Sequence, residues 1–267
     1  MILKCIGSGS SGNCYLLTDS NGKTLILDCG LSIREIKKGL NYDLRCVAGC
    51  IVTHHHKDHS KSAKDLEEIG IEVYKPYEEC YKAMNFKKAP FLISTVPMQD
   101  KDGKFCHTNT DGSECPCYGF IISHPEMGKL LYVTDTEFVK WRFRNLNHIL
   151  VSCNYQKKYI SKVAGKREHV FRGHMELETV KDFVTANNSD ALQNVILCHM
   201  SKESADPKEC MQEVKSVLES ANVCVAERGL EVELRKKGVA NVIHSTQCII
   251  IANNGREFHI RSEQSHR

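Results

Sequence analysis

Long apolar runs, a leader-like N-terminus and cysteine pairs of C-x-x-C spacing are all missing from this chain of 267 residues. No apolar run approaches the roughly 20 residues of a membrane-spanning helix, so we expect no membrane partner. The chain begins directly with a strand-like segment and shows no basic and then apolar leader. We therefore expect a cytoplasmic protein whose fourteen cysteines are reduced thiols.

Cysteine is abundant, yet no C-x-x-C pair is present. Many of the cysteines fall in predicted strands, where a free thiol packs like a small apolar side chain. Cys115 and Cys117, with Cys106 nearby, could instead hold an additional zinc ion. Because zinc-binding cysteines usually come in closely spaced pairs of the missing kind, packing is the favoured interpretation.

Internal repeats, low-complexity tracts and domain-scale linkers are absent as well. The length suits one large α/β domain or two small ones. A charged fraction of 26% and a hydrophobic fraction of 41% are those of an ordinary globular protein. We expect residues 1–267 to form a single domain, with a core over about 1–235 and a C-terminal β-hairpin extension over about 236–267.

The net charge of +3 gives no reason by itself to expect nucleic acid, but basic residues gather between positions 140 and 172. Only one acidic residue, Glu168, falls in that span. Such a stretch beside an active site could guide a polyanion, and a solvated surface explains it equally well. The basic residues are Lys140, Arg142, Arg144, Lys157, Lys158, Lys162, Lys166, Arg167 and Arg172.

Apolar periodicity and turn residues predict strands alternating with helices, which is typical of a layered α/β fold. Asn21-Gly22 predicts a hairpin turn, and Ser32 with Glu35 predicts a capping box that opens a helix. Segments 75–117 and 155–173 are irregular in pattern. The predicted strands are 2–6, 14–18, 24–28, a strand ending at 53, 71–74, 118–123, 129–134, 148–152, 195–198, a pair formed by 223–227 and 231–234, and a hairpin of 248–252 and 256–260. The predicted helices are 33–40, 61–69, 176–187 and 207–221.

Four metal-capable side chains follow directly after the apolar run 49–52. His54, His56, Asp58 and His59 form an H-x-H-x-D-H motif. Imidazole and carboxylate together suit zinc, manganese or iron, and two neighbouring groups of ligands suit two ions. A histidine-rich surface loop is the alternative, but it does not explain an Asp-His pair at these offsets.

Three further candidates share one kind of position, directly after an apolar strand. His199 follows 195–198, Asp135 follows 130–134, and His107 follows the shorter run Phe105-Cys106. Asp135 could instead cap a helix that begins at Glu137. His199 could be a core histidine, and His174 could cap the following helix or be exposed.

The order of these motifs resembles the metallo-β-lactamase superfamily. The resemblance is narrower still to the YycJ-type branch, whose members are linked to metal-dependent DNA exonuclease activity. Four segments carry this narrower resemblance: 7–13, 25–32, 173–174 and 198–201. The resemblance covers nearly the whole chain. It implies an αββα four-layer sandwich of the α/β (α+β) class, with the site at one edge of the two sheets.

Carried over residue by residue, the resemblance implies two divalent metal ions, zinc or manganese or iron, joined by a bridging carboxylate. The first ion would be held by His54, His56 and His107, the second by Asp58, His59 and His199, and Asp135 would bridge them. His174 would act beside the phosphate, donating to an oxygen or protonating the leaving group. Asp28 and Asn154 would orient these groups.

Two departures from the branch's pattern are visible. Thr108 follows His107 where the branch usually has aspartate, Asp111 comes only later, and the segment 108–114 is an extension. Cys153 precedes Asn154 where a serine-asparagine pair is expected.

The implied reaction is hydrolysis of a phosphodiester by a hydroxide that bridges the two metals, with Asp58 or Asp135 accepting the proton. Ser11 and Asn13 lie in a glycine-rich segment that could bind phosphate through backbone N–H groups. That segment could equally form a tight turn, and the lack of a Gly-Lys-Ser/Thr ending excludes a Walker loop. Lys157, Lys158, Lys166 and Arg167 would contact a DNA strand.

Three kinds of substrate stay open at this point. DNA ends are favoured, a cyclic nucleotide is the alternative because its hydrolysis needs the same chemistry, and a thioester or lactam is less favoured. A broad basic groove would favour DNA, whereas a closed pocket completed by a partner subunit would favour the nucleotide. The terminal hairpin could extend a sheet, cover the core or mediate a homodimer.

Overall fold

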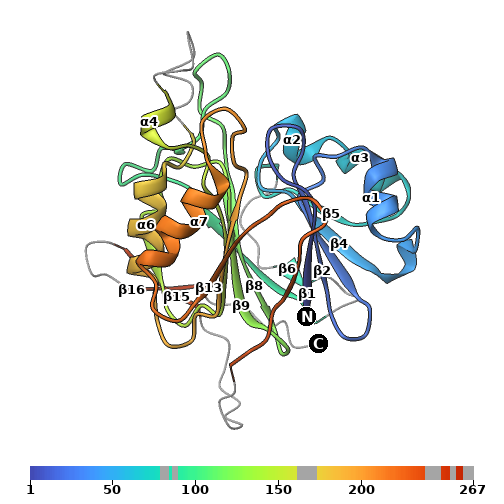
Figure 1. The fold of residues 1–267 in the computed structure, drawn as a ribbon. Coiled ribbons are helices and arrows are strands. Elements are labelled where there is room, and N and C mark those ends of the chain that lie inside the picture. The colour runs from blue at the N-terminus through green and yellow to red at the C-terminus, as the bar shows by residue number, and fades with distance from the viewer. Residues whose placement is uncertain (79–83, 86–89, 161–172, 238–247, 253–256, 261–267) are drawn as a thin grey trace.

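The structure is a computed structural model that describes residues 1–78, 84–85, 90–160, 173–237, 248–252 and 257–260, the segments 84–85, 248–252 and 257–260 as backbone only. Two β-sheets face each other, and helices cover their outer faces (Figure 1). One sheet has the strand order β14-β1-β2-β3-β4-β5, and the other has the order β13-β12-β11-β9-β8-β7-β6. The predicted αββα four-layer sandwich is therefore confirmed.

The first sheet and its helices come mainly from the N-terminal part of the chain. Its strands are β1 (Ile2–Gly7), β2 (Cys14–Thr18), β3 (Thr24–Leu27), β4 (Val47–Ile51), β5 (Val73–Tyr74) and β14 (Glu231–Glu233). Its helices are α1 (Ile33–Gly39), the 3-10 turn η1 (Leu44–Cys46), α2 (Lys57–Ser60) and α3 (Ala63–Glu68).

The second sheet is built from the rest of the chain. Its strands are β6 (Met84–Asn85), β7 (Leu92–Pro97), β8 (Tyr118–His124), β9 (Gly128–Val133), β11 (His148–Ser152), β12 (Asn194–Cys198) and β13 (Asn222–Val225). Its outer face is covered by α6 (Leu177–Ala186) and α7 (Pro207–Ser216), while α4 (Lys157–Ile160) lies near one end of the sandwich (Figure 1).

Three apolar clusters fill the three spaces between the four layers. One, around Phe120 and Tyr132, lies between the two sheets. A second, around Val180 and Val214, packs α6 and α7 onto the larger sheet. The third, around Ile36 and Leu66, packs α1 and α3 onto the smaller sheet. The inner strands of the two sheets therefore bury side chains on both faces, and β4 and β11 are buried along their whole length.

Most predicted elements are confirmed within a few residues. Ser32 caps α1 in a capping box with Glu35, and β2 and β3 form an antiparallel hairpin around Gly22, whose φ of 77° suits glycine. The segment 75–117 is more regular than expected, because it contains β7 paired with β8. The short elements α2, α4 and β10 (Trp141–Phe143) were also not predicted.

The prediction that 223–227 pairs with 231–234 is wrong. β13 runs parallel to β12 in one sheet, whereas β14 runs antiparallel to β1 in the other. The segment between them crosses from sheet to sheet: Ala226 N–H donates to the Leu197 carbonyl, and Cys5 N–H donates to the Leu230 carbonyl. The two strands are neighbours in the sequence, but each one forms the edge of a different sheet.

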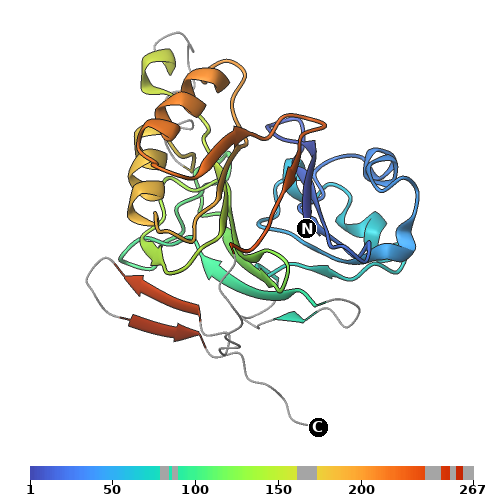
Figure 2. The same cartoon turned by 60° about the horizontal axis from the view of Figure 1, so that its bottom comes forward.

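The predicted C-terminal hairpin forms from β15 (Cys248–Ala252) and β16 (Glu257–Ile260). β15 also pairs antiparallel with β10, so the hairpin builds a separate three-stranded sheet of order β10-β15-β16 (Figure 2). It thus extends neither of the two main sheets. Among the helices of the described residues, none has the length and apolar character that crossing a bilayer requires.

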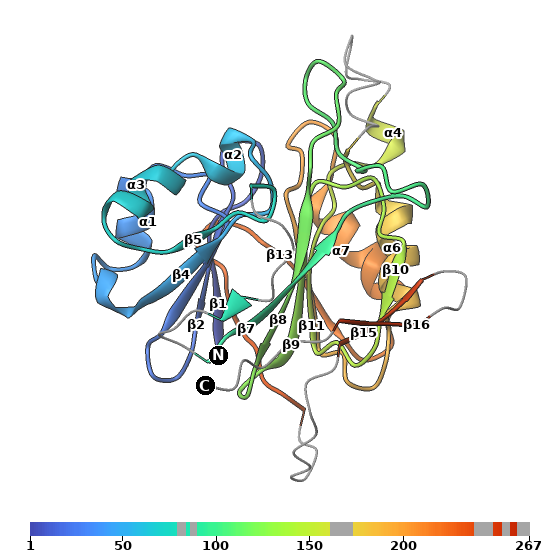
Figure 3. The same cartoon turned by 180° about the vertical axis from the view of Figure 1, so that it is seen from behind.

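The loops that carry the metal-binding motif lie where the two sheets approach each other, on the side of α2 (Figure 3). The N–H of Tyr118, the first residue of β8, donates to the Thr53 carbonyl at 3.0 Å. This bond joins the start of a strand in one sheet to the end of the β4 segment in the other. Side chains from both sheets can therefore meet at this edge.

Candidate metal centre

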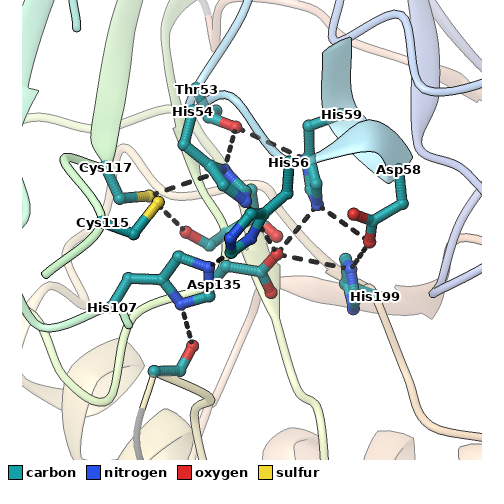
Figure 4. Close-up of polar contacts among 12 residues, drawn as sticks. Thr53, His54, His56, Asp58, His59, His107, Cys115, Cys117, Asp135 and His199 are labelled. Carbon is teal, nitrogen blue, oxygen red and sulfur yellow. Dashed lines mark hydrogen bonds and ion pairs between the residues drawn. The ribbon is translucent and has the colours of Figure 1, made fainter. Parts of the chain in front are cut away.

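Three of the predicted site residues leave their strands through a left-handed backbone conformation. Asp28 after β3, Asp135 after β9 and His199 after β12 have φ values of 55°, 47° and 50°. This conformation is uncommon outside glycine and occurs where the surrounding structure requires it. At all three positions it turns the chain so that the side chain joins the same cluster (Figure 4 shows Asp135 and His199).

The first group of candidate ligands consists of His54, His56 and His107, whose nitrogens lie within 4.8 Å of one another. His107 Nε2 lies 3.0 Å from His56 Nδ1. Each ring turns its other nitrogen away from the group. The structure thus brings together the three histidines that the resemblance assigns to the first ion.

The partners of the outer nitrogens determine which nitrogen of each ring carries the proton. His107 Nδ1 donates to the Gly173 carbonyl at 3.0 Å, and His56 Nε2 donates to Asn109 Oδ1 at 3.0 Å. Thr53 Oγ1 donates to Asp28, so at 3.0 Å it accepts from His54 Nδ1. All three inner nitrogens are therefore left with lone pairs.

These converging lone pairs fit a cation. His54 Nε2 is buried and has no hydrogen-bond partner among the described residues. Burial lowers the pKa of His54 well below its ordinary value, lowers the pKa of His107 to about 3, and lowers the pKa of His56 as well, so the rings are neutral at pH 7. Two neutral acceptors 3.0 Å apart repel each other, whereas a metal ion between them would accept both.

The second group consists of Asp58, His59, Asp135 and His199, again within 4.8 Å of one another. Asp135 Oδ2 lies 2.8 Å from His59 Nε2 and 3.4 Å from His199 Nε2. Asp58 Oδ2 lies 3.2 Å from His199 Nε2. Asp135 Oδ2 also lies 3.6 Å from His54 Nε2, so this carboxylate stands between the two groups (Figure 4).

Charge in the second group is balanced between carboxylates and imidazolium ions. Burial alone would lower the pKa of His59, but the carboxylates of Asp28 and Asp135 raise it well above its ordinary value. Burial alone would raise the pKa of Asp58, but hydrogen bonds from His199 and His59 hold it far below its usual range. A divalent ion bound to this group would displace the imidazolium protons.

Asp28 fixes the loop that carries the H-x-H-x-D-H motif through hydrogen bonds. Its carboxylate accepts from His59 Nδ1 at 2.7 Å, from the Thr53 N–H at 2.8 Å and from the Tyr132 hydroxyl at 2.5 Å. With Nδ1 as the donor, His59 presents Nε2 to Asp135 and Asp58. The support from Tyr132 was not predicted, because a continuous apolar strand gives no sign that one hydroxyl reaches the site.

Asn154 and Asn13 hold the second group from two other sides. Asn154 donates to Asp135 Oδ1 at 3.3 Å and to the His199 carbonyl at 3.1 Å, and its own oxygen accepts from the Met175 N–H. Asn13 is fully buried, and its amide spans Gly9, Asp58 and His59. This placement puts Asn13 beneath the cluster and away from a surface open to substrate.

The glycine-rich segment forms a turn that positions other groups. Ser11 is exposed at its tip. Ser8, which was not singled out from the sequence, accepts from the His199 N–H at 2.9 Å. Gly12 N–H bonds to the Gly9 carbonyl, as in a tight turn. The turn interpretation therefore describes this segment.

His174 faces both groups. Its ring centre lies 6.0 Å from that of His107 and 6.4 Å from that of His199. It does not cap the following helix, because the N-cap of α6 is Glu176. The helix-cap alternative for Asp135 is likewise excluded, since no helix begins at Glu137. The His199 ring points to Asp58 and Asp135.

The extension after His107 folds into a small turn that reaches back to the centre. Thr108 pairs with Glu114, and Gly112 N–H donates to the Asn109 carbonyl. The Asn109 amide nitrogen donates to Ser113 Oγ and to the Glu114 carbonyl, which leaves its oxygen for His56 Nε2. Asn109 was missed from the sequence, whereas Asp111, the carboxylate nearest to the branch's pattern, is exposed and bonds to Ser113.

We expect Asn109→Ala to weaken metal binding by the first group by roughly 10–100-fold, the usual effect of removing a partner that orients a metal-binding histidine. The loss follows because His56 would no longer be held with Nδ1 facing His107. Competition with a chelating dye would measure the affinity. Asp111→Asn, in the same turn but without contact to His56, is the matched control, and an equal loss in both variants would contradict this role.

The predicted basic contacts are only partly placed, because Lys162, Lys166, Arg167 and Arg172 lie outside the described residues. Lys157 and Lys158 lie on α4 and are exposed, and they form ion pairs with Glu176 and Glu209. Arg142 donates to the carbonyl of Ala186 at the far end of α6, about 15 Å of helix away from the end beside the site. The basic residues of this stretch that the structure describes therefore do not form one continuous track.

The twelve cysteines whose side chains the structure describes are free thiols. Cys106 and Cys117 contact the carbonyls of Lys104 and Thr134, and Cys117 also lies 3.9 Å from His54 Nδ1. Cys115 lies with histidines instead, within 4.8 Å of ring nitrogens of His55 and His56. The three cysteines that were considered as one zinc site are thus not gathered into one cluster in the described structure.

Comparison with known proteins agrees with this fold. Residues 7–126 match the model of the metallo-beta-lactamase superfamily. The crystal structure of the metallo-beta-lactamase fold protein YhfI from Bacillus subtilis superposes with a TM-score of 0.60 at 16% identity, covering 87% of this chain and 99% of that one. The fold and the resemblance to this superfamily are confirmed.

Two curated relatives differ in how much of the chain they match. The exodeoxyribonuclease YycJ of Bacillus anthracis is 25% identical over 254 residues, which cover 83% of this chain and 90% of YycJ. The anti-Pycsar protein Apyc1 of Bacillus phage vB_BsuM-Goe3 is 33% identical over 75 residues, which cover 26% of this chain and 28% of Apyc1. The likeness to YycJ is lower but extends over most of both proteins.

Proposed function

We propose that this metallo-β-lactamase-fold chain is a two-metal phosphodiester hydrolase that removes nucleotides from DNA ends. The observation that carries the proposal is the pair of converging ligand groups, one of three imidazoles and one of two imidazoles and a carboxylate, with Asp135 between them. The similarity to an exodeoxyribonuclease over most of the chain supports DNA as the substrate.

The first ion would be held by His54, His56 and His107, the second by Asp58, His59 and His199, and Asp135 would be shared. Such ions would supply positive charge to phosphate oxygens and lower the pKa of water so that it attacks at neutral pH. The histidine-carboxylate set accepts zinc, manganese or iron. Asp28, Asn109 and the Gly173 carbonyl fix the histidine tautomers that this arrangement needs.

Two groups are placed to move protons. Asp58 is the most exposed member of the second group, with 26% of its side chain accessible, and we assign it to accept the proton of the attacking water. His174 faces both groups across about 6 Å, and we assign it to donate to the departing oxygen. These roles place the base and the acid on different elements around the phosphate.

A cleavage assay with added Mn²⁺ or Zn²⁺ tests the proposal by comparing end-labelled linear DNA with a panel of cyclic nucleotides. We expect stepwise shortening of the DNA from its end, absent in His56→Ala. Turnover of a cyclic nucleotide with intact DNA would assign the chain to small-molecule phosphodiesterases. Inactivity on both substrates with metal bound would reject phosphodiester hydrolysis and direct attention to thioesters and lactams.

Replacing both Lys157 and Lys158 with alanine should weaken DNA binding and make it less dependent on salt. Each lysine that neutralises one phosphate contributes about one to the slope of log affinity against log salt, so the slope should fall by about two. Fluorescence anisotropy over a series of salt concentrations measures this. Arg142→Ala, at the other end of α6, should leave the slope unchanged; an unchanged slope in the double variant would place the DNA elsewhere.

A further inference from the structure

A third group of metal-capable side chains lies beside the candidate centre. Cys115 Sγ lies 3.6 Å from His55 Nδ1, and both atoms lie within 4.8 Å of a ring nitrogen of His56. His55 is exposed and Cys115 is fully buried, so the group runs from the surface inward. Neither His55 nor Cys115 belongs to the two groups already described.

The distance between sulfur and nitrogen is that of two ligands on one tetrahedral zinc. Bond lengths of about 2.3 Å to sulfur and 2.0 Å to nitrogen put the two ligand atoms about 3.5 Å apart. The observed separation is 3.6 Å. Cys115 and His55 could therefore close on one ion with little movement of either side chain.

The chemistry of this group differs from that of its neighbours. The first and second groups offer only imidazole and carboxylate, which accept manganese and iron as well as zinc. A thiolate is a soft ligand, and it selects zinc, cadmium or copper(I) over manganese. A site of two imidazoles and one thiolate therefore binds soft metal ions in preference to manganese.

We propose that His55, His56 and Cys115 form a separate binding site for a thiophilic ion at the rim of the candidate centre. Binding releases the Cys115 thiol proton to solvent and forms a sulfur-metal bond. His56 is common to this site and to the first group, so an ion bound here competes with the first group for that ring. Excess zinc or cadmium therefore opposes metal loading of the first group.

Titration of the full chain with Cd²⁺ tests the site, because a cadmium-thiolate bond has its own ultraviolet charge-transfer absorption. We expect a saturable band that Cys115→Ser removes. Cys117→Ser, two residues away and also buried, should retain it. His55→Ala changes an exposed side chain, so it should leave the fold intact while weakening cadmium binding by at least roughly 10-fold.

A band that persists in Cys115→Ser, or cadmium affinity that is unchanged in His55→Ala, would overturn the assignment, as would the absence of a band in the parent chain. The measurement does not depend on turnover. A chain that shows the band but cleaves no phosphodiester would retain this site and lose the proposed function. A chain that cleaves DNA but shows no band would retain the proposed function and lose this site.

Discussion

Asp135→Asn is expected to reduce phosphodiester hydrolysis by roughly 10²–10³-fold or more, the effect of removing one group that organises charge at a reaction centre. Asp135 Oδ2 lies within 3.6 Å of His54, His59 and His199, so it is the carboxylate common to both groups. An amide keeps the shape of the side chain but removes the negative charge that holds two cations close together. Metal stoichiometry measured on the purified variant should fall together with the rate.

The control for this variant is Asp111→Asn, which makes the same chemical change on an exposed side chain outside the centre. Circular dichroism and thermal unfolding should show both variants folded. If Asp135→Asn kept full metal content and full rate, the carboxylate would not be the shared ligand, and the two groups would act independently.

Gly30→Ala is expected to cost several kcal/mol of folding free energy or to prevent folding. A Cβ at this position would lie 1.7 Å from the Asp58 carbonyl oxygen and 2.8 Å from the His59 backbone nitrogen. Overpacking commonly costs about 1–3 kcal/mol, and more where, as here, the obstructing atoms are backbone. Because the displaced backbone carries Asp58 and His59, any folded protein should also bind metal more weakly.

Chemical denaturation and metal titration measure the two effects of Gly30→Ala separately. Gly70→Ala is the reference, since nothing lies within 4 Å of its Cβ position and only its φ of +81° opposes alanine. That substitution should cost only about 1–2 kcal/mol of backbone strain. Equal destabilisation by the two variants would show that the approach of the Gly30 loop to Asp58 is not a tight one.

The spacing of residues along the chain marked the candidate ligands, and the resemblance to the superfamily assigned them to two groups. His54, His56, Asp58 and His59 follow one strand within six residues, and Asp135 and His199 each follow an apolar strand. Asp135 and His199 follow strands of the other sheet, so the pattern marked the candidates and the packing of the two sheets brought them together. Burial on both faces made those strands recognisable as near-continuous apolar runs.

Sequence reasoning was weaker where a contact depends on a loop. Asn109 was missed since nothing in its neighbourhood indicates that a turn after His107 would reach His56. Conversely, Ser11 and Asn13 share one glycine-rich segment, yet one side chain is exposed and the other is fully buried. Backbone turns decide such differences, and the residue types of the segment allow either outcome.

The sequence by itself therefore determined a layered α/β fold, the order of the motifs and the identity of the candidate ligands, because these follow from apolar periodicity and from positions directly after strands. The four-layer arrangement was implied by the resemblance to the metallo-β-lactamase superfamily. Only the tertiary structure decided which nitrogen of each histidine faces inward, that Cys115 lies beside His55, and that β13 and β14 belong to different sheets. Those features depend on contacts between residues far apart in the chain, whose geometry is set when the two sheets pack together.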